Sequence, residues 1–171
     1  MPGEGRADIL GPNDVKMVHR VLKIGRWVVD FLFADTRYDI EGVVSCLRHA
    51  EAPRHIIDQA IELMEEGSPN AGFTYTNAVV FRAIVCIGPT TSGAEFIDTL
   101  THEIHHLAVA VARELGIDLE SETPAYLAGD TMREFADVVC RLGCEHCHPE
   151  TKNPRHPIKD DGDFRWVLAH Q

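Results

Sequence analysis

The hydrophobic positions in the first half of the chain follow two different periods. Dense apolar runs rich in β-branched and aromatic residues predict strands, and apolar residues recurring every three or four positions predict helices. The first pattern predicts two strand pairs, at residues 18–24 with 27–33 and at residues 73–76 with 78–88. A single amphipathic helix over residues 17–34 is the alternative to the first pair. The second pattern predicts helices at residues 38–49 and 53–66.

The second half of the chain is predicted to be helical. The run over residues 78–88 is nearly continuously apolar, as in a strand covered on both faces. A long helix is expected at residues 94–115, with Gly116 as its C-cap. A second long helix is expected at residues 122–142, with Pro124 in its first turn. These elements predict an α+β fold.

Length and charge narrow the class of protein. The 171 residues fit one domain, which we place at residues 15–145, between a loose leader (1–14) and a tail rich in His, Cys and Pro (146–171). The net charge of −11 argues against a nucleic-acid partner, because such a surface repels phosphate.

The absence of targeting signals and the cysteine count predict where the protein works. The chain shows neither a secretory signal nor an apolar run long enough for a membrane span. Its five cysteines are an odd number, which favours a reducing compartment over disulfides. We therefore expect a cytoplasmic protein without membrane association.

A candidate metal motif lies in the first long helix. The segment His102-Glu103-Ile104-His105-His106 fits the pattern H-E-x-x-H. Residues four apart lie on one helix face, so His102 and His106 can bind one zinc ion. Glu103 can then act as general base toward a zinc-bound water. The pair His102 and His105 would leave Glu103 without this role, so we expect His105 to be a surface or supporting residue.

The motif also has a structural interpretation, in which these histidines form part of a solvated polar stripe on the helix. The neighbouring sequence favours the metal site, since the motif lies in an amphipathic helix preceded by an apolar strand.

The sequence resembles a known family over residues 73–142, in the stretches TSGAEFIDTLTHEIHHL and ESETPAYLAGD. It is similar to zincin metallopeptidases of the gluzincin type, which place a zinc-binding Glu, often as E-x-x-A, on the helix after H-E-x-x-H. It also resembles small zincin-like proteins of phage and mobile-element origin. The resemblance implies a compact domain whose small, mostly antiparallel sheet packs on the two long helices. An edge strand of this sheet would receive a peptide or protein substrate, and the 73–88 hairpin would lie nearest the cleft.

The third zinc ligand is expected beyond the first helix. The family pattern favours Glu122, and Glu120 is its near neighbour. A compact link between the helices would favour Asp130 or Glu134 instead. Tyr126, one turn after Glu122, is a candidate oxyanion donor or a tyrosine that packs between the helices.

The cysteines of the tail suggest a second metal. Cys140, Cys144 and Cys147, with His148, could hold a structural zinc, although a single C-x2-C pair is a weak signal. The tail could also cap the catalytic zinc. Cys140 has a plain alternative as a core residue, as have Cys46 and Cys86. The remaining histidines are expected to be surface residues: His19, His49, His55 and His170.

We therefore expect a zinc metallopeptidase with a zincin-like α+β domain. One alternative is a catalytically inactive zincin-like binding or regulatory module that keeps zinc for structure. Another is a mostly helical interaction protein whose cysteine tail holds the metal. The substrate and the oligomeric state do not follow from the sequence.

Overall fold

The computed structural model of the chain describes residues 17–143. The predicted leader, the tail and its residues Cys144, Cys147 and His148 lie outside them. The described part has an α+β fold, and its elements along the chain are β1 (Met17–Ile24), β2 (Trp27–Ala34), α1 (Ile40–His49), α2 (Arg54–Glu66), β3 (Gly72–Asn77), β4 (Arg82–Ile87), α3 (Gly93–Glu114), α4 (Thr123–Glu134) and α5 (Ala136–Gly143).

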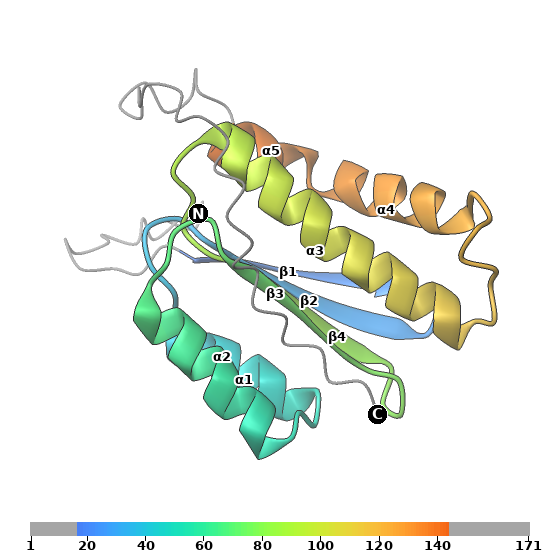
Figure 1. Cartoon of the computed structure of the whole chain (residues 1–171), viewed down its shortest axis with the longest axis horizontal. Coiled ribbons are helices and arrows are strands. Elements are labelled where there is room, and N and C mark those ends of the chain that lie inside the picture. The colour runs from blue at the N-terminus through green and yellow to red at the C-terminus, as the bar shows by residue number, and fades with distance from the viewer. Residues whose placement is uncertain (1–16, 144–171) are drawn as a thin grey trace, which may run out of the picture.

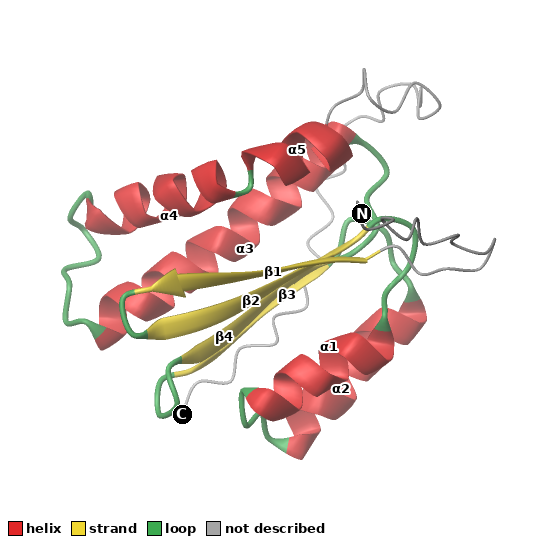
Figure 2. Ribbon diagram, turned by 180° about the vertical axis from the view of Figure 1, so that it is seen from behind, coloured by secondary structure: helices red, strands yellow, loops and turns green. Residues whose placement is uncertain are grey.

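The strands form one mixed sheet with the order β1-β2-β4-β3. The β1–β2 and β3–β4 pairings are antiparallel, and β2 pairs with β4 in parallel. Helices α1 and α2 cover one face of the sheet, and α3, α4 and α5 cover the other (Figures 1 and 2). The protein is therefore built in three layers, with β3 as the edge strand beside α3.

Two hydrophobic cores fill the spaces between these layers. Side chains alternate along a strand, so Phe31 and Phe33 of β2 face α3 while Leu32 between them faces α1. The α3-side core includes Val85 of β4, and the α1-side core includes Ile84. Both faces of β4 are thus buried, which confirms the prediction from its continuous apolar run.

The first strand pair is confirmed, and the single-helix alternative is wrong. The second hairpin is shorter than predicted, because residues 78–81 form a turn. The side chain of Asn77 accepts a hydrogen bond from the backbone N–H of Val79 at 3.0 Å, and this local bond competes with strand pairing. Val79 is accordingly exposed, and Phe81 adopts a φ of +51°.

The predicted helix at residues 122–142 is two helices, α4 and α5, separated at Phe135. Phe135 is buried, and its ring centroid lies 4.3 Å from that of Phe31 and 5.4 Å from that of Phe33. The sequence has neither Gly nor Pro at this position, so nothing local indicates the break. We attribute it to the insertion of this ring into the α3-side core.

Close packing at Gly93 gives a stability prediction. A Cβ atom on Gly93 would overlap the backbone oxygen of Gly143, where α3 meets α5. We expect Gly93→Ala to lower the free energy of unfolding by about 1–3 kcal/mol, because backbone must shift to admit the methyl group. Urea denaturation followed by circular dichroism measures the change.

Gly129 in α4 is the matched control. Nothing lies within 4 Å of a Cβ built there. Gly129→Ala should raise the free energy of unfolding by about 0.5–1 kcal/mol, because alanine loses less backbone entropy in a helix. Equal stability of the two variants would contradict the close approach of α3 and α5.

Candidate metal centre

Helix α3 carries the H-E-x-x-H motif and is well defined at both ends. The side chain of Ser92 accepts a hydrogen bond from the backbone N–H of Glu95 at 3.2 Å, which caps the N-terminus. Gly116 beyond the C-terminus has a φ of +66°, as expected for the residue that ends a helix. The helix packs on β3, β4 and α4. The motif therefore lies on a rigid element.

The two histidines of the motif face each other. The Nε2 atoms of His102 and His106 lie 3.1 Å apart, and both residues are half-buried. Two nitrogens bound tetrahedrally to zinc at ~2.0–2.1 Å would be separated by roughly 3.3 Å. The observed distance is close to this value, so the pair fits a shared metal ion.

The electrostatic surroundings favour the metal-binding form of His106. Burial lowers the pKa of this imidazole, and the neighbouring His102 and His105 lower it further. A neutral imidazole is the form that binds a metal. His105 is exposed, in agreement with its prediction as a surface or supporting residue.

Glu103 lies between α3 and the edge strand β3 and is only 6% exposed. The hydroxyl of Thr74 donates hydrogen bonds to its carboxylate Oε2 at 2.7 Å and to its backbone oxygen at 3.1 Å. Gly72 permits this approach, because a Cβ atom there would lie 3.0 Å from Cγ of Glu103. Burial raises the pKa of Glu103 to about 7, although the bond from Thr74 lowers it. A carboxyl group of this kind can exchange a proton near neutral pH.

Thr74 was not among the candidate residues from the sequence. A threonine in a predicted strand is ordinary, and only the pairing of β3 with β4 and the packing of α3 bring it to Glu103. The one available signal was the position of Thr74 in the hairpin expected nearest the cleft.

Removing this hydroxyl should destabilise the protein. Thr74→Val keeps the shape of the side chain but leaves a buried carboxyl group without its donor. We expect the free energy of unfolding to fall by about 1–3 kcal/mol. Urea denaturation of the variant at neutral pH measures this loss.

Thr101→Val is the comparison for this variant. Thr101 is exposed on the same helix as Glu103, and its hydroxyl donates to the backbone oxygen of Ile97 at 2.7 Å. Its replacement should change stability by less than about 0.5 kcal/mol. A similar small effect at both threonines would show that Thr74 does not stabilise Glu103.

The candidate third ligands lie on or near α4. Glu122 is the exposed N-cap of this helix, and its carboxylate accepts a hydrogen bond from the hydroxyl of Tyr126 at 3.0 Å. Tyr126 is 66% exposed, so the alternative that it packs between the two helices is wrong. Asp130 forms an ion pair with Arg133 at 2.8 Å.

The structure brings His102 and His106 together without Glu122. Among residues 17–143, one group of three His, Cys, Asp or Glu side chains has its ligand atoms within 4.8 Å of one another, and it consists of His19, Asp30 and Cys46. Glu122 does not form such a group with His102 and His106. Glu120 and Glu134 are exposed. The identity of the third ligand stays a prediction.

The described cysteines differ in burial. Cys86 is fully buried in β4, which confirms it as a core residue, and Cys46 is half-buried against the α1-side core. Cys140 is exposed on α5, so its interpretation as a core residue is wrong. Because Cys144, Cys147 and His148 lie outside the described residues, the second zinc site stays a prediction.

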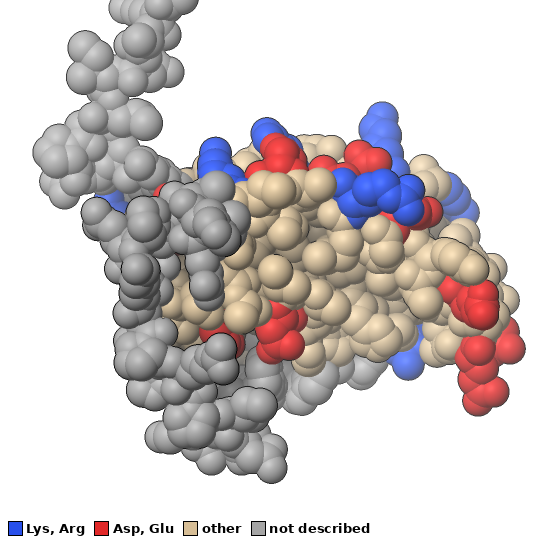
Figure 3. Space-filling model, turned by 90° about the horizontal axis from the view of Figure 1, so that it is seen from above, with Lys and Arg blue, Asp and Glu red and all other residues tan. Residues whose placement is uncertain are grey.

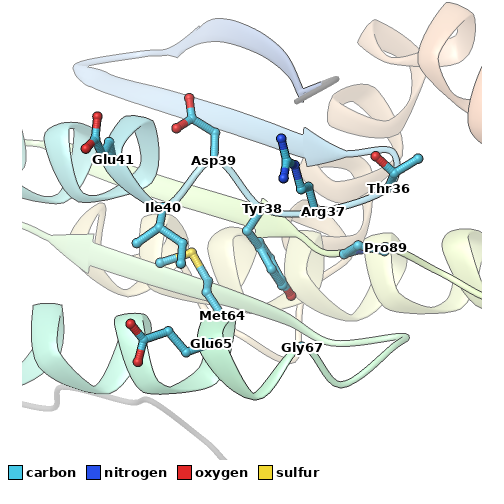
Figure 4. Close-up of a pocket in the computed structure, with 10 residues that line it drawn as sticks. All are labelled: Thr36, Arg37, Tyr38, Asp39, Ile40, Glu41, Met64, Glu65, Gly67 and Pro89. Carbon is cyan, nitrogen blue, oxygen red and sulfur yellow. The ribbon is translucent and has the colours of Figure 1, made fainter. Parts of the chain in front are cut away.

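A separate pocket of about 560 Å³ lies at the end of the α1–α2 layer. Figure 4 shows its lining, which comes from residues 36–41, the end of α2 and Pro89. The hydroxyl of Tyr38 donates to the backbone oxygen of Ala71, the residue before β3, at 3.3 Å, and burial raises the pKa of this hydroxyl. No lining residue belongs to α3, so this pocket is distinct from the candidate metal centre.

Neither the surface charge nor comparison with known proteins identifies a ligand or a family for this site. In Figure 3, acidic and basic side chains are mixed along the upper edge of the described part, and other residues cover most of the middle of this face. Over residues 17–143, no helix is both long and apolar enough to cross a membrane. Protein-family models, curated proteins and solved structures contain no match to this chain.

Proposed function

We propose that this chain is a zinc-dependent metallopeptidase of the zincin type. The observation that carries the proposal is the geometry of α3, where the Nε2 atoms of His102 and His106 lie 3.1 Å apart. Glu103 directly follows His102 in the motif and is buried, and its carboxylate accepts a hydrogen bond from the hydroxyl of Thr74. A helix with a solvated polar stripe would not require a buried glutamate next to this pair.

Three residues of the motif, together with Thr74, have a role in the proposed reaction. His102 and His106 would hold the metal. Zinc bound there would lower the pKa of a water molecule and polarise a substrate carbonyl. Glu103 accepts the proton of the attacking water and delivers it to the leaving amine. Thr74 fixes the orientation of this carboxylate through its hydroxyl group.

The position of β3 supports a peptide substrate. β3 ends the described sheet, so its outer side offers backbone N–H and C=O groups to an extended chain. A peptide added there would run beside the strand that carries Thr74. The substrate in this proposal is therefore a peptide or protein in extended conformation.

Glu122 remains the proposed third ligand, by resemblance to gluzincins. We also propose that the protein works in the reducing cytoplasm. The three described cysteines, which are free thiols, are compatible with that compartment.

A specific observation favours the inactive zincin-like module as a second candidate. The carboxylate of Glu103 already accepts a hydrogen bond and is packed against Gly72. Two substitutions test the two candidates, with hydrolysis of quenched fluorescent casein and zinc content as readouts. Glu103→Gln tests the general base, and His102→Ala tests the metal. Activity lost in both variants supports the peptidase, whereas wild-type protein that binds zinc without hydrolysing peptides supports the module.

A further inference from the structure

Three side chains of metal-ligand type meet on the face of the sheet opposite α3. They are His19 of β1, Asp30 of β2 and Cys46 of α1, and one ligand atom from each lies within 4.8 Å of the other two. The closest pair is His19 Nε2 and Asp30 Oδ1, at 2.8 Å. These residues lie 11 and 16 positions apart along the chain, so the fold alone gathers them.

Strand register explains this meeting. His19 pairs with Leu32, whose side chain belongs to the α1-side core. Asp30 lies two residues before Leu32 on β2 and therefore points to the same face. Cys46 lies on α1, which packs over this face. A nitrogen, an oxygen and a sulfur thus converge between α1 and the β1–β2 hairpin.

Asp30 is the least expected member of the cluster, because it is only 7% exposed in the middle of an apolar strand. A buried carboxylate costs free energy unless a cation or hydrogen bonds compensate it. Its carboxylate contacts His19 through Oδ1 and Arg82 through Oδ2, the latter at 3.8 Å. The Arg82 contact is an ion pair longer than a hydrogen bond, so His19 supplies the one short contact to this carboxylate among the described residues.

We propose that His19, Asp30 and Cys46 form a binding site for a divalent transition-metal cation of the zinc class. Imidazole nitrogen, carboxylate oxygen and thiolate sulfur are all zinc ligands, and three of them leave a fourth position for water. The thiolate excludes magnesium and calcium as preferred occupants, since those cations select oxygen ligands.

The charges around the cluster are compatible with reversible binding of a divalent cation. Asp30 and the Cys46 thiolate together balance a divalent cation. Burial, followed by Asp30, raises the pKa of the Cys46 thiol, so the cation must displace its proton. Arg82 weakens cation binding by its own charge and contacts Oδ2, so a metal would bind Oδ1 and replace its hydrogen bond with His19 Nε2. The side chain of His19 is 45% exposed and provides access from solvent.

This site is independent of the H-E-x-x-H motif. α1 and α3 lie on opposite faces of the sheet (Figures 1 and 2). The two sites share no residue, and the inference stands whether or not the chain hydrolyses peptides.

Cobalt binding tests the inference in a variant that lacks the other candidate sites. The parent variant of the full chain carries His102→Ala, Cys144→Ser and Cys147→Ser. Titrated with Co²⁺, it should bind about one ion per chain and develop the near-ultraviolet absorption of a thiolate-to-cobalt bond. Adding Cys46→Ser should abolish this band, and adding His19→Gln should weaken Co²⁺ binding by at least about 10-fold.

His49→Gln is the matched control, because His49 lies one turn from Cys46 on α1, and its ring nitrogen contacts the backbone oxygen of Ser45. It should leave Co²⁺ binding unchanged. A parent variant that folds and binds no Co²⁺ would overturn the inference, as would a band that survives Cys46→Ser.

A second measurement uses the wild-type chain and does not depend on how the parent variant folds. Iodoacetamide labelling of the peptide that contains Cys46 is followed by mass spectrometry with and without Zn²⁺. Zn²⁺ should slow the labelling of Cys46 by at least about 10-fold, because a metal-bound thiolate is a poorer nucleophile than a free one. Labelling at the same rate in both conditions would refute the site.

Discussion

Glu103→Gln is expected to lower peptide hydrolysis by about 10²–10⁴-fold, which is the usual contribution of a general base. Glutamine has nearly the same shape as glutamate and can still accept a hydrogen bond from the hydroxyl of Thr74. It cannot take a proton from water. The variant should therefore fold and bind zinc like the wild type while losing turnover. The measurement is the initial rate of hydrolysis of quenched fluorescent casein at neutral pH.

Glu114→Gln is the control for the charge change. Glu114 is exposed at the end of α3, and its substitution removes the same negative charge from the same helix. It should keep the wild-type rate. If Glu103→Gln retained full activity, the proposed mechanism would be wrong. If the wild type had no activity and both variants kept their zinc, the binding module would be the better description.

His102→Ala is expected to remove about one zinc ion per chain relative to the wild type. The Nε2 atoms of His102 and His106 lie 3.1 Å apart and form the proposed ligand pair. The substitution leaves only His106 of this pair. Only His106 and the proposed ligand Glu122 would then remain, one fewer than the three protein ligands of a catalytic zinc site, so we expect zinc to be lost on dialysis against a weak chelator. Elemental analysis of both proteins after the same dialysis measures the difference. Counting the difference, rather than the total, separates this ion from any held by the tail or by His19, Asp30 and Cys46.

His105→Ala is the matched control on the next position of the helix. His105 is exposed, and it is also one turn from His102. We expect this variant to keep its zinc. Loss of the ion in His105→Ala with retention in His106→Ala would instead assign the metal to His102 and His105, and Glu103 would then lose its proposed role.

The sequence by itself determined the local elements and the two facing histidines. Strand and helix periods follow from which side of each element is buried. The runs around Gly25 therefore favoured β1 and β2 over a single helix, and the pattern over residues 53–66 predicted α2. The spacing of His102 and His106 likewise fixes their contact, because residues four apart on a helix are neighbours. These features depend on short stretches of chain.

Contacts between distant segments were decided only by the tertiary structure. Three features depend on residues from different elements. They are the hydrogen bond from Thr74 to Glu103, the packing of Phe135 on Phe31 at the helix break, and the proximity of Asp30 to Cys46. Their sequence signals are a threonine in a strand, a phenylalanine in a helix and an acid in an apolar run. Each signal acquires its meaning only when the layers pack, because packing decides which side chains share a buried space.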